Sequence, residues 1–379
     1  MHRRTRRTVS QLVIFVGILT LLILVNRPPN TPRSFAWTKV RYQTTAHTLP
    51  QSRGRCPGLS KSSKPALIVS HVDSDGDTAW LTSSSLSKKY HLCIYNVDAD
   101  DSARNLRVPS NRAHEAMAYL TFLIDNYDAV PRAGAVFVHG SRWAWHNDAP
   151  DYDNAHLLAQ LDIRSALKPA GYHNLRCDWS VSTCSANSPP QGSLQMAFQA
   201  VMDPWDARAA SDAALPSALG SIFGGSTGEL LSRHEAVRAQ CCAQFVVSRE
   251  RVQSHSREEY VALRQWLLDG SDDGASSSSS SSSSGGRVVR REAVAPADDR
   301  VAGRILSYIW HILFLDVGQG LDGGLDLGAL NRAACPTAQD CYCRLYGRCD
   351  LDRCRSPGSC DGQYVIPNSY RVPGHEHGV

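Results

Sequence analysis

The sequence predicts an α/β fold, a three-layer arrangement around a mostly parallel, doubly wound sheet. Three short apolar segments, at 65–70, 91–97 and 135–138, have the length and composition of buried strands. Each of them ends in a polar cluster, and segments with helical periodicity lie between them. Strand, helix, strand, helix, strand in this order is typical of a parallel sheet with helices on both faces.

The N-terminal segment predicts a transmembrane anchor. Four Arg between residues 3 and 7 precede an uncharged apolar run at 12–25, which with 8–11 approaches the ~20 residues that span a bilayer as a helix. A cleaved signal peptide is the alternative, but Asn26, Arg27 and two Pro follow the run instead of a small-residue cleavage site. The excess of Arg before the run predicts a single-pass type II membrane protein of the Golgi or another secretory-pathway compartment.

Composition divides the chain into five parts. A stretch rich in Pro, Ser and Thr follows the anchor and lacks the apolar residues of a core, and a later run of Ser flanked by Gly predicts a flexible insertion. The expected parts are a cytosolic tail at 1–10, a transmembrane signal anchor at 11–27, a disordered stem at 28–64, a lumenal α/β domain at 65–315 that contains a disordered Ser-rich insertion at 271–299, and a Cys-rich, partly disordered tail at 316–379.

The α/β domain shows its clearest elements in order. Strand 65–70 leads into an acidic turn at 73–77, and strand 91–97 ends in Asp98-Ala99-Asp100. Residues 112–127 predict a helix because their apolar side chains repeat at helical spacing, and strand 135–138 follows.

The hydrophobic pattern is less regular over residues 149–240, and clear strand and helix patterns resume after them. An apolar segment at 241–248 predicts a further strand. Helical spacing then predicts a helix from Arg257 through Leu267 and another over 301–315, which is expected to dock onto the core.

The twelve Cys favour disulfides and an oxidising compartment, because their number is even and six lie from Cys335 onward. The alternative is zinc at Cys341-Tyr342-Cys343, but this is one tight pair where structural zinc sites usually have two. The spacing of Cys177 and Cys184 would suit a small disulfide loop. The adjacent pair 241–242 is expected to be structural.

Polar side chains at the strand ends form the candidate site, since open α/β sheets bind ligands at the carboxyl ends of their strands. Carboxylates there suit Mg²⁺ or Mn²⁺ carrying a diphosphate, and His146, Asn147 and Asp148 are candidates for metal ligands or for a base. Arg249 and Glu250 are candidates for binding a phosphate and an acceptor hydroxyl. The alternative for these clusters is hydrogen-bonded turns and ordinary helix caps.

Charge and motif content argue against several classes of protein. The formal charge of +4 is small for 379 residues, and no basic stripe interleaved with aromatic residues occurs, so nucleic-acid binding is not indicated. The sequence contains no nucleophile elbow, Walker loop or dinucleotide glycine fingerprint, which lowers hydrolase, ATPase and dehydrogenase interpretations.

Short blocks in a fixed order match a known family. They include Trp143-Ala144-Trp145-His146-Asn147 and Cys241-Cys242-Ala243-Gln244-Phe245, and they lie at 77–81, 115–121, 124–128, 136–140, 143–147, 171–172, 174–177, 241–245, 247–251, 266–268 and 341–343. On these blocks the chain, over roughly residues 65–350, resembles the largely fungal domain-of-unknown-function family 3431.

The resemblance implies an enzyme, because family members with a simpler N-terminal motif are similar to nucleotide-sugar transferases of the GT-A type. It implies a nucleotide-sugar donor, a glycan acceptor and Mn²⁺ or Mg²⁺, with Trp143 and Trp145 as a stacking wall for the sugar. The sequence departs from the family where a nucleotide would sit. His114 stands where an Arg usually precedes Glu115, and the acidic turn is rearranged around Gly76, so a weakened or altered donor site is expected.

We therefore expect a glycosyltransferase-like enzyme, with two alternatives. One is a catalytically inactive carbohydrate-binding or scaffold protein on the same fold, and the other is a metal-dependent hydrolase that uses His139, His146 and Asp148. The expected catalytic residues are His146, Asp148 and Glu250; the expected substrate-binding residues are Asp75, Asp77, Glu115, His139, Trp143, Trp145, Asn147 and Arg249; the expected metal ligands are Asp148 and His146.

Overall fold

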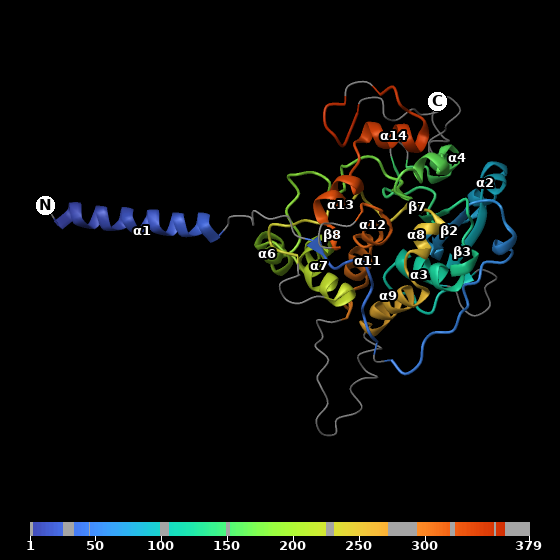
Figure 1. The fold of residues 1–379 in the computed structure, drawn as a ribbon, viewed down its shortest axis with the longest axis horizontal. Helices are drawn as coiled ribbons and strands as arrows, with labels where there is room; N and C mark the ends of the chain where they lie inside the picture. The colour runs from blue at the N-terminus through green and yellow to red at the C-terminus, as the bar shows by residue number, and fades with distance from the viewer. Residues whose placement is uncertain are drawn as a thin grey trace, which may run out of the picture. The chain divides into compact units, whose positions relative to one another are not determined.

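The computed structural model describes residues 3–25, 34–44, 46–98, 106–148, 152–224, 231–271, 294–318, 323–351 and 354–360. The chain forms two compact units, Met1–Arg33 and Ser34–Val379 (Figure 1). The first unit contains α1 (Arg3–Val25), whose first turns hold the Arg-rich segment. Among the described residues, none of the helices combines the length and the apolar composition that crossing a membrane requires, so the transmembrane anchor is not confirmed.

A six-stranded sheet organises the second unit, in the order β4-β3-β2-β5-β7-β6. The strands are β2 (Ala66–His71), β3 (His91–Asn96), β4 (Leu106–Arg107), β5 (Ala135–His139), β6 (Tyr172–Asn174) and β7 (Phe245–Val247). The first four in the order are mutually parallel, which confirms the mostly parallel α/β sheet, but β7 runs antiparallel to both of its neighbours.

Alternate residues of each central strand enter two separate hydrophobic clusters, so both faces of the sheet are buried. In β2, Ala66 and Ile68 belong to one cluster and Leu67 and Val69 to the other. A parallel strand covered on both faces needs such a continuous apolar run, because a polar side chain on either face would lose its water. This is the physical basis of the strand pattern in the sequence.

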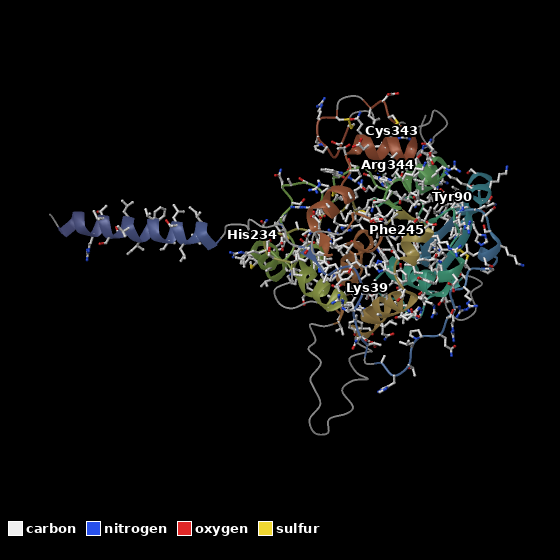
Figure 2. All side chains as sticks on the ribbon, viewed as in Figure 1. Lys39, Tyr90, His234, Phe245, Cys343 and Arg344 are labelled. Carbon is white, nitrogen blue, oxygen red and sulfur yellow. A yellow bond between two sulfur atoms is a disulfide. The ribbon has the colours of Figure 1, made fainter. Side chains whose placement is uncertain are left out.

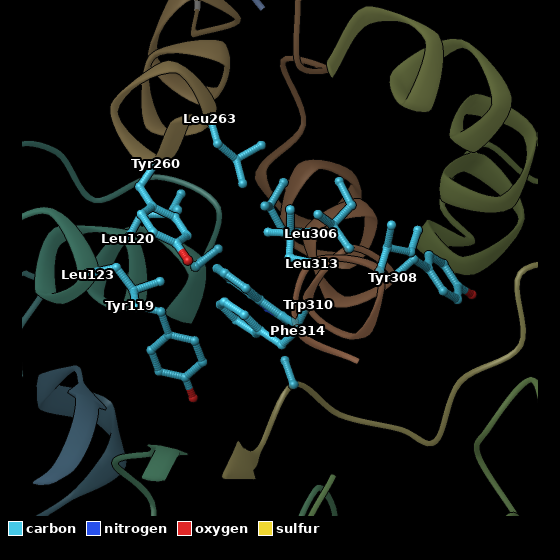
Figure 3. Packing of buried hydrophobic residues seen from close by; sticks show 14 of the residues in the cluster. Tyr119, Leu120, Leu123, Tyr260, Leu263, Leu306, Tyr308, Trp310, Leu313 and Phe314 are labelled. Atoms are coloured by element: carbon cyan, nitrogen blue, oxygen red, sulfur yellow. The ribbon is translucent and has the colours of Figure 1, made fainter. Parts of the chain in front are cut away.

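The larger cluster packs helices α3 (Glu115–Asp125), α9 (Arg257–Asp269), α11 (Asp299–Ser307) and α12 (Trp310–Phe314) against one face. Figure 3 shows aromatic side chains from α3, α9 and α12 close together. Trp310 and Phe314 lie nearly parallel, with ring centroids 6.2 Å apart, and Tyr119 packs edge-on against Phe137 of β5 at 5.0 Å. Figure 2 shows Phe245 of β7 among the packed side chains of this unit.

The smaller cluster covers the other face. It takes side chains from α2 (Ser84–Lys89), α4 (Asn154–Gln160), α5 (Ile163–Ala166) and α14 (Ala338–Tyr346). The remaining elements are β1 (Ser34–Phe35), η1 (Leu59–Lys61), η2 (Asp73–Asp75), η3 (Ala79–Thr82), η4 (Tyr127–Ala129), α6 (Leu194–Met202), α7 (Ala207–Phe223), α8 (Arg249–Gln253), β8 (Leu325–Asp326) and α13 (Leu327–Ala334). Helices therefore lie on both faces of the sheet.

Part of the expected stem belongs to the folded unit. Phe35 and Trp37 are buried in the larger cluster, and β1 pairs antiparallel with β8 near the other end of the chain. A disulfide joins Cys56 to Cys93 of β3. The expectation of disorder through residue 64 was wrong because it averaged composition over the segment, whereas a few large apolar side chains and one covalent bond fix residues 34–44 and 46–64.

Six disulfides use all twelve Cys, which confirms the disulfide prediction and removes the zinc alternative. The disulfide expected between Cys177 and Cys184 is not formed. They bond instead to Cys341 and Cys335, across separations of 164 and 151 residues. The last two pairs, Cys343–Cys349 and Cys354–Cys360, close small loops after the middle of α14.

Several predicted segments differ in extent from the structure. The strand predicted at 241–248 is reduced to β7, because Cys242 and Ala243 take positive φ values that an extended strand excludes. The helix predicted over 301–315 is divided into α11 and α12. The run 276–284 and Asp100 lie outside the described residues. Residues 294–299, expected inside the flexible insertion, are described, and Ala295 is buried in the core.

Candidate functional site

A cavity of about 690 Å³ lies at the carboxyl ends of β2 and β5. From β2 the sheet continues through β3 and β4 in one direction, while β5 lies on the other side, so the strand order reverses between β2 and β5. Open α/β sheets bind ligands outside such a reversal. The lining includes Asp75, His114, Glu115, His139, Trp143, Trp145, His146, Arg208, Cys241, Cys242, Arg300, Arg304 and Tyr308.

The two strand ends approach each other closely at Gly140. Ser70 of β2 pairs with His139 of β5, and the chain turns at Gly140 directly afterwards. A Cβ at Gly140 would lie 2.8 Å from the Cα of His71 and 2.7 Å from Oδ2 of Asp75. Any side chain there would push the strand ends apart, so the glycine permits the contact that closes this wall of the cavity.

The acidic turn after β2 places one of its two candidate carboxylates in the cavity and the other in solvent. Asp75 lines the cavity, where its Oδ2 accepts a hydrogen bond from the backbone N–H of Val72 and lies 3.7 Å from Nδ1 of His71. Asp77 does not line the cavity. It is exposed, and its Oδ1 caps the backbone N–H of Ala79, as the alternative of an ordinary turn predicted.

His139 and Glu115 form the central acid–base pair. The Nε2 atom of His139 is 2.8 Å from the carbonyl oxygen of Cys242, and a carbonyl oxygen only accepts, so Nε2 carries a proton. Nδ1 of the same ring is 3.9 Å from Oε2 of Glu115, and both side chains are largely buried. A carboxylate next to an imidazole in a cavity is an arrangement that transfers protons.

Glu115 is held in place by the beginning of α3. The buried guanidinium of Arg112 donates hydrogen bonds to Asp299 and to carbonyl oxygens of Leu267 and Ala297, which ties this segment to α9 and α11. Ala113 and His114 then take φ values of 57° and 53°. Non-glycine residues with positive φ are strained and persist where the surroundings enforce them, which is frequent at functional sites.

His146 stacks on His139, with ring centroids 4.6 Å apart, and Trp145 covers it at 4.1 Å. Burial, and then the nearby His139, Arg176 and His114, lower the pKa of His146 to about 3. The ring is therefore neutral near pH 7. Its Nδ1 is buried without a hydrogen-bond partner among the described residues, so it offers an unused donor or acceptor beside the cavity.

Three Arg form a cationic side of the cavity. Arg300 and Arg304 lie on α11 and Arg208 on α7. One amino group of Arg304 is 3.2 Å from the hydroxyl of Tyr308, while its Nε is buried without a hydrogen-bond partner among the described residues. Arg208 lies 3.9 Å from the buried Asp212. Such groups are suited to phosphate oxygens, which accept hydrogen bonds from guanidinium donors.

The two Trp of the loop after β5 differ in exposure. Both line the cavity, but Trp145 is 57% exposed while Trp143 is covered on one side by the guanidinium of Arg142 at 4.6 Å. Trp145 therefore presents an open indole face, the kind of surface on which a ligand ring packs.

Asn147 and Asp148 are buried behind the cavity and do not line it. The Oδ2 atom of Asp148 accepts hydrogen bonds from the backbone N–H of Cys177 at 2.9 Å and from the hydroxyl of Tyr342 at 2.7 Å. Asn147 donates to the carbonyl oxygens of Arg142 and Tyr152. Both side chains hold the loop in shape, so the expected pairing of His146 with Asp148 around a metal is not supported.

The residues of the cavity do not fit a protein-built Mg²⁺ or Mn²⁺ site. Among the described residues, the only group of three that brings His, Cys, Asp or Glu ligand atoms together is Cys56, His91 and Cys93, and its two Cys form a disulfide. Hard cations need several oxygen ligands. The part of the cavity that the structure describes offers Asp75 and Glu115 as its carboxylates, without such a cluster.

Arg249 and Glu250 are not brought to the cavity. They begin α8, directly after β7, and β7 pairs Val247 with Ala135 at the amino end of β5. Four steps along the strand from Ala135 to His139, at ~3.3 Å each, separate the two ends by roughly 13 Å. Our expectation assumed that the strand at 241–248 was parallel; because β7 is antiparallel, its carboxyl end faces the opposite edge of the sheet.

The three Arg of the cationic side, Tyr308 and the role of Cys242 were not predicted from the sequence. The spacing of Arg300 and Arg304, one helical turn apart, was a usable signal, because residues four apart share a helix face. Arg208 lies in the less regular segment 149–240, which gave no signal, and Tyr308 lies in an apolar helical segment whose pattern indicated only a core role. Cys242 was expected to be structural only, and its carbonyl oxygen instead contacts His139.

Comparison with known proteins identifies one family. The model of the family described as "Protein of unknown function (DUF3431)" matches residues 67–344, which include all of β2 but its first residue, β3 to β7, and the cavity residues described above. No curated protein and no solved structure matches the chain.

Proposed function

The chain belongs to the DUF3431 family of proteins of unknown function, and from its cavity we propose that it is a glycosyltransferase-like enzyme that uses a nucleotide-sugar. The observation that carries the proposal is the combination of groups in one cavity: the pair of Glu115 and His139, the open indole of Trp145, and the cationic side formed by α7 and α11. The volume of about 690 Å³ lies within the range of small-molecule sites.

The cationic side would bind the diphosphate of the donor. Arg300 and Arg304 supply guanidinium groups, and the buried Nε of Arg304 has an unused N–H. In a transfer reaction the leaving diphosphate gains negative charge, and fixed positive groups stabilise that charge as it develops. Because the described acids of the cavity do not form a cation cage, the guanidinium groups, and not Mn²⁺ or Mg²⁺, would neutralise the diphosphate.

The acid–base pair would activate the acceptor hydroxyl. A general base must lie within hydrogen-bond reach of the proton it takes, and the Glu115 carboxylate and the His139 ring both line the cavity. His146 is neutral near pH 7, so it would act as a hydrogen-bond partner for a sugar hydroxyl. Trp145 would pack on the sugar ring, as expected from the sequence.

The proposal includes the secretory pathway. Six disulfides support an oxidising compartment, and the Arg-rich beginning of the chain is the basis for a type II arrangement with the second unit in the lumen. Protease protection of sealed microsomes tests the topology. Digestion of the second unit without detergent would contradict it.

A ligand screen tests the enzymatic proposal. The melting temperature of the full chain is measured with uridine, guanosine and cytidine nucleotide-sugars, each with Mn²⁺ and with a chelator, and released nucleotide is then assayed with mixed glycan acceptors. We expect at least one nucleotide-sugar to raise the melting temperature in the presence of chelator, since a ligand that binds the native state stabilises it. Binding to glycans without nucleotide release would favour the inactive carbohydrate-binding alternative, and binding of neither class would reject both.

A further inference from the structure

The disulfide between Cys241 and Cys242 differs from the other five. Its partners are neighbours in the chain, whereas the other five span separations of 6 to 164 residues. In the chain-entropy account, a disulfide stabilises a fold by closing a loop of the unfolded chain, and a bond between neighbours closes none. Its contribution therefore lies in the local conformation that it imposes.

That local conformation is unusual and borders the cavity. Cys242 has a φ of 124° and Ala243 one of 53°, values that residues with a side chain rarely adopt. Both Cys line the cavity, and β7 begins two residues after Ala243. The covalent ring constrains the turn that brings the chain from the cavity wall into the sheet.

The same turn holds His139 at two points. The carbonyl oxygen of Cys242 accepts the hydrogen bond from Nε2 of His139 at 2.8 Å, and the side-chain oxygen of Gln244 accepts one from the backbone N–H of His139 at 3.3 Å. Gln244 is itself fixed, because it donates to Asn147 and accepts from Asn154. The position of the Cys242 carbonyl relative to the His139 ring thus depends on the turn.

We infer that the Cys241–Cys242 disulfide is a positioning element that fixes His139 in the Nε2–H tautomer and leaves the lone pair of Nδ1 on the side of Glu115. A ring nitrogen that donates to a fixed carbonyl determines which nitrogen keeps the lone pair. In the proposed transferase this makes Nδ1, beside Glu115, the ring nitrogen of the acid–base pair that can accept a proton, so the inference rests on that function and deepens it. The tautomer itself is a property of the free protein and holds for any ligand.

Nuclear magnetic resonance of the full chain labelled with ¹⁵N-histidine tests the inference, with a His139→Gln variant to assign the signal. We expect the neutral form of His139 to be a single tautomer, Nε2–H, in the unmodified protein. In the double variant Cys241→Ser/Cys242→Ser we expect loss of the single-tautomer signal. The matched control, Cys343→Ser/Cys349→Ser, removes a disulfide of separation 6 that does not line the cavity, and should leave the His139 signal unchanged.

A second arm uses the unmodified protein, in case the double variant does not fold. A dithiol reductant breaks the bond between the two sulfurs, leaving a thiol on each Cys and a cyclic disulfide in the reductant, and peptide mapping identifies which pairs have been reduced. Loss of the tautomer signal should follow reduction of 241–242. The inference is overturned if mapping finds two thiols at 241–242 in the untreated protein, or if the tautomer persists after that pair is reduced. Because neither arm uses a ligand, its result is separate from that of the nucleotide-sugar screen.

Discussion

The loop after β5 and the beginning of α8 occupy similar positions in the sequence pattern but have different surroundings in the structure. Each follows a buried strand, and each places charged or polar side chains directly after it. The loop after β5 supplies His139, Trp145 and His146 to the cavity, whereas Arg249 and Glu250 lie at the other edge of the sheet. At α8, Ser248 accepts a hydrogen bond from the backbone N–H of Arg251, an ordinary helix cap. The comparison teaches that strand direction, more than local composition, decides which cluster reaches a ligand.

The largest difference between the two regions is expected in the effect of Glu substitutions on turnover, at Glu115 and at Glu250. Glu115→Gln should lower turnover of the donor found in the ligand screen by roughly 100-fold or more, because a positioned general base contributes about 10²–10⁴-fold. Glu250→Gln, outside the cavity, is the matched control and should keep its activity. Steady-state kinetics on both variants, with melting temperatures as a check on folding, decides the matter. Equal losses in the two variants would remove the distinction between the two edges of the sheet.

Within the loop after β5, Asp148 is expected to stabilise the fold, whereas Trp145 and His146 line the cavity. Asp148→Ala leaves the Cys177 N–H and the Tyr342 hydroxyl without their buried acceptor, and we expect it to lower the free energy of unfolding by about 2–4 kcal/mol. Urea unfolding measures the change. Asp148→Asn retains one acceptor oxygen and should be less destabilising. A stable Asp148→Ala variant that loses metal or ligand binding would instead restore the site role expected from the sequence.

Arg304 on α11 and Arg249 on α8 give a smaller contrast. Arg304→Ala should weaken binding of a nucleoside diphosphate roughly tenfold or more, since a hydrogen bond to a charged group contributes about 1.5–3 kcal/mol. Arg249→Ala removes a partly buried side chain outside the cavity that donates to the Asp128 carbonyl oxygen, and should leave the affinity unchanged. Isothermal titration with uridine and guanosine diphosphates compares them. An unaffected Arg304→Ala variant would show that α11 is not the phosphate side.

The smallest expected effect is the pH dependence caused by His146. Its pKa is lowered to about 3, so between about pH 3 and 6.5 the unfolded chain binds more protons at this residue than the native state does. Stability should therefore fall as pH falls through that window, by at most about 1.4 kcal/mol per pH unit from this group. Urea unfolding at pH 7.5 and 5 measures the fall, and His146→Gln should reduce it. An unchanged pH dependence in the variant would place the neutral His146 ring in doubt.

Patterns among neighbouring residues correctly predicted several of the strands and helices. β2, β3, β5, α3 and α9 appeared within a few residues of their predicted positions, because continuous apolar runs and helical spacing are properties of neighbouring residues. His139, His146 and Trp145 were predicted on the same basis, as side chains that follow a parallel strand. The even number of Cys was enough to predict disulfides, but not which residues they join.

Two features were decided only by the tertiary structure, the direction of β7 and the role of Asp148, and both depend on residues far apart in the chain. The direction of β7 follows from its pairing with β5 and β6, and it removed Arg249 and Glu250 from the site. Asp148 is fixed by Tyr342, 194 residues away. Hydrophobic periodicity determines which residues are buried, because burial depends on nearby side chains. The partner of a given side chain and the direction of a strand depend on the free energy of the whole packed chain. The sequence of a short segment does not determine that free energy.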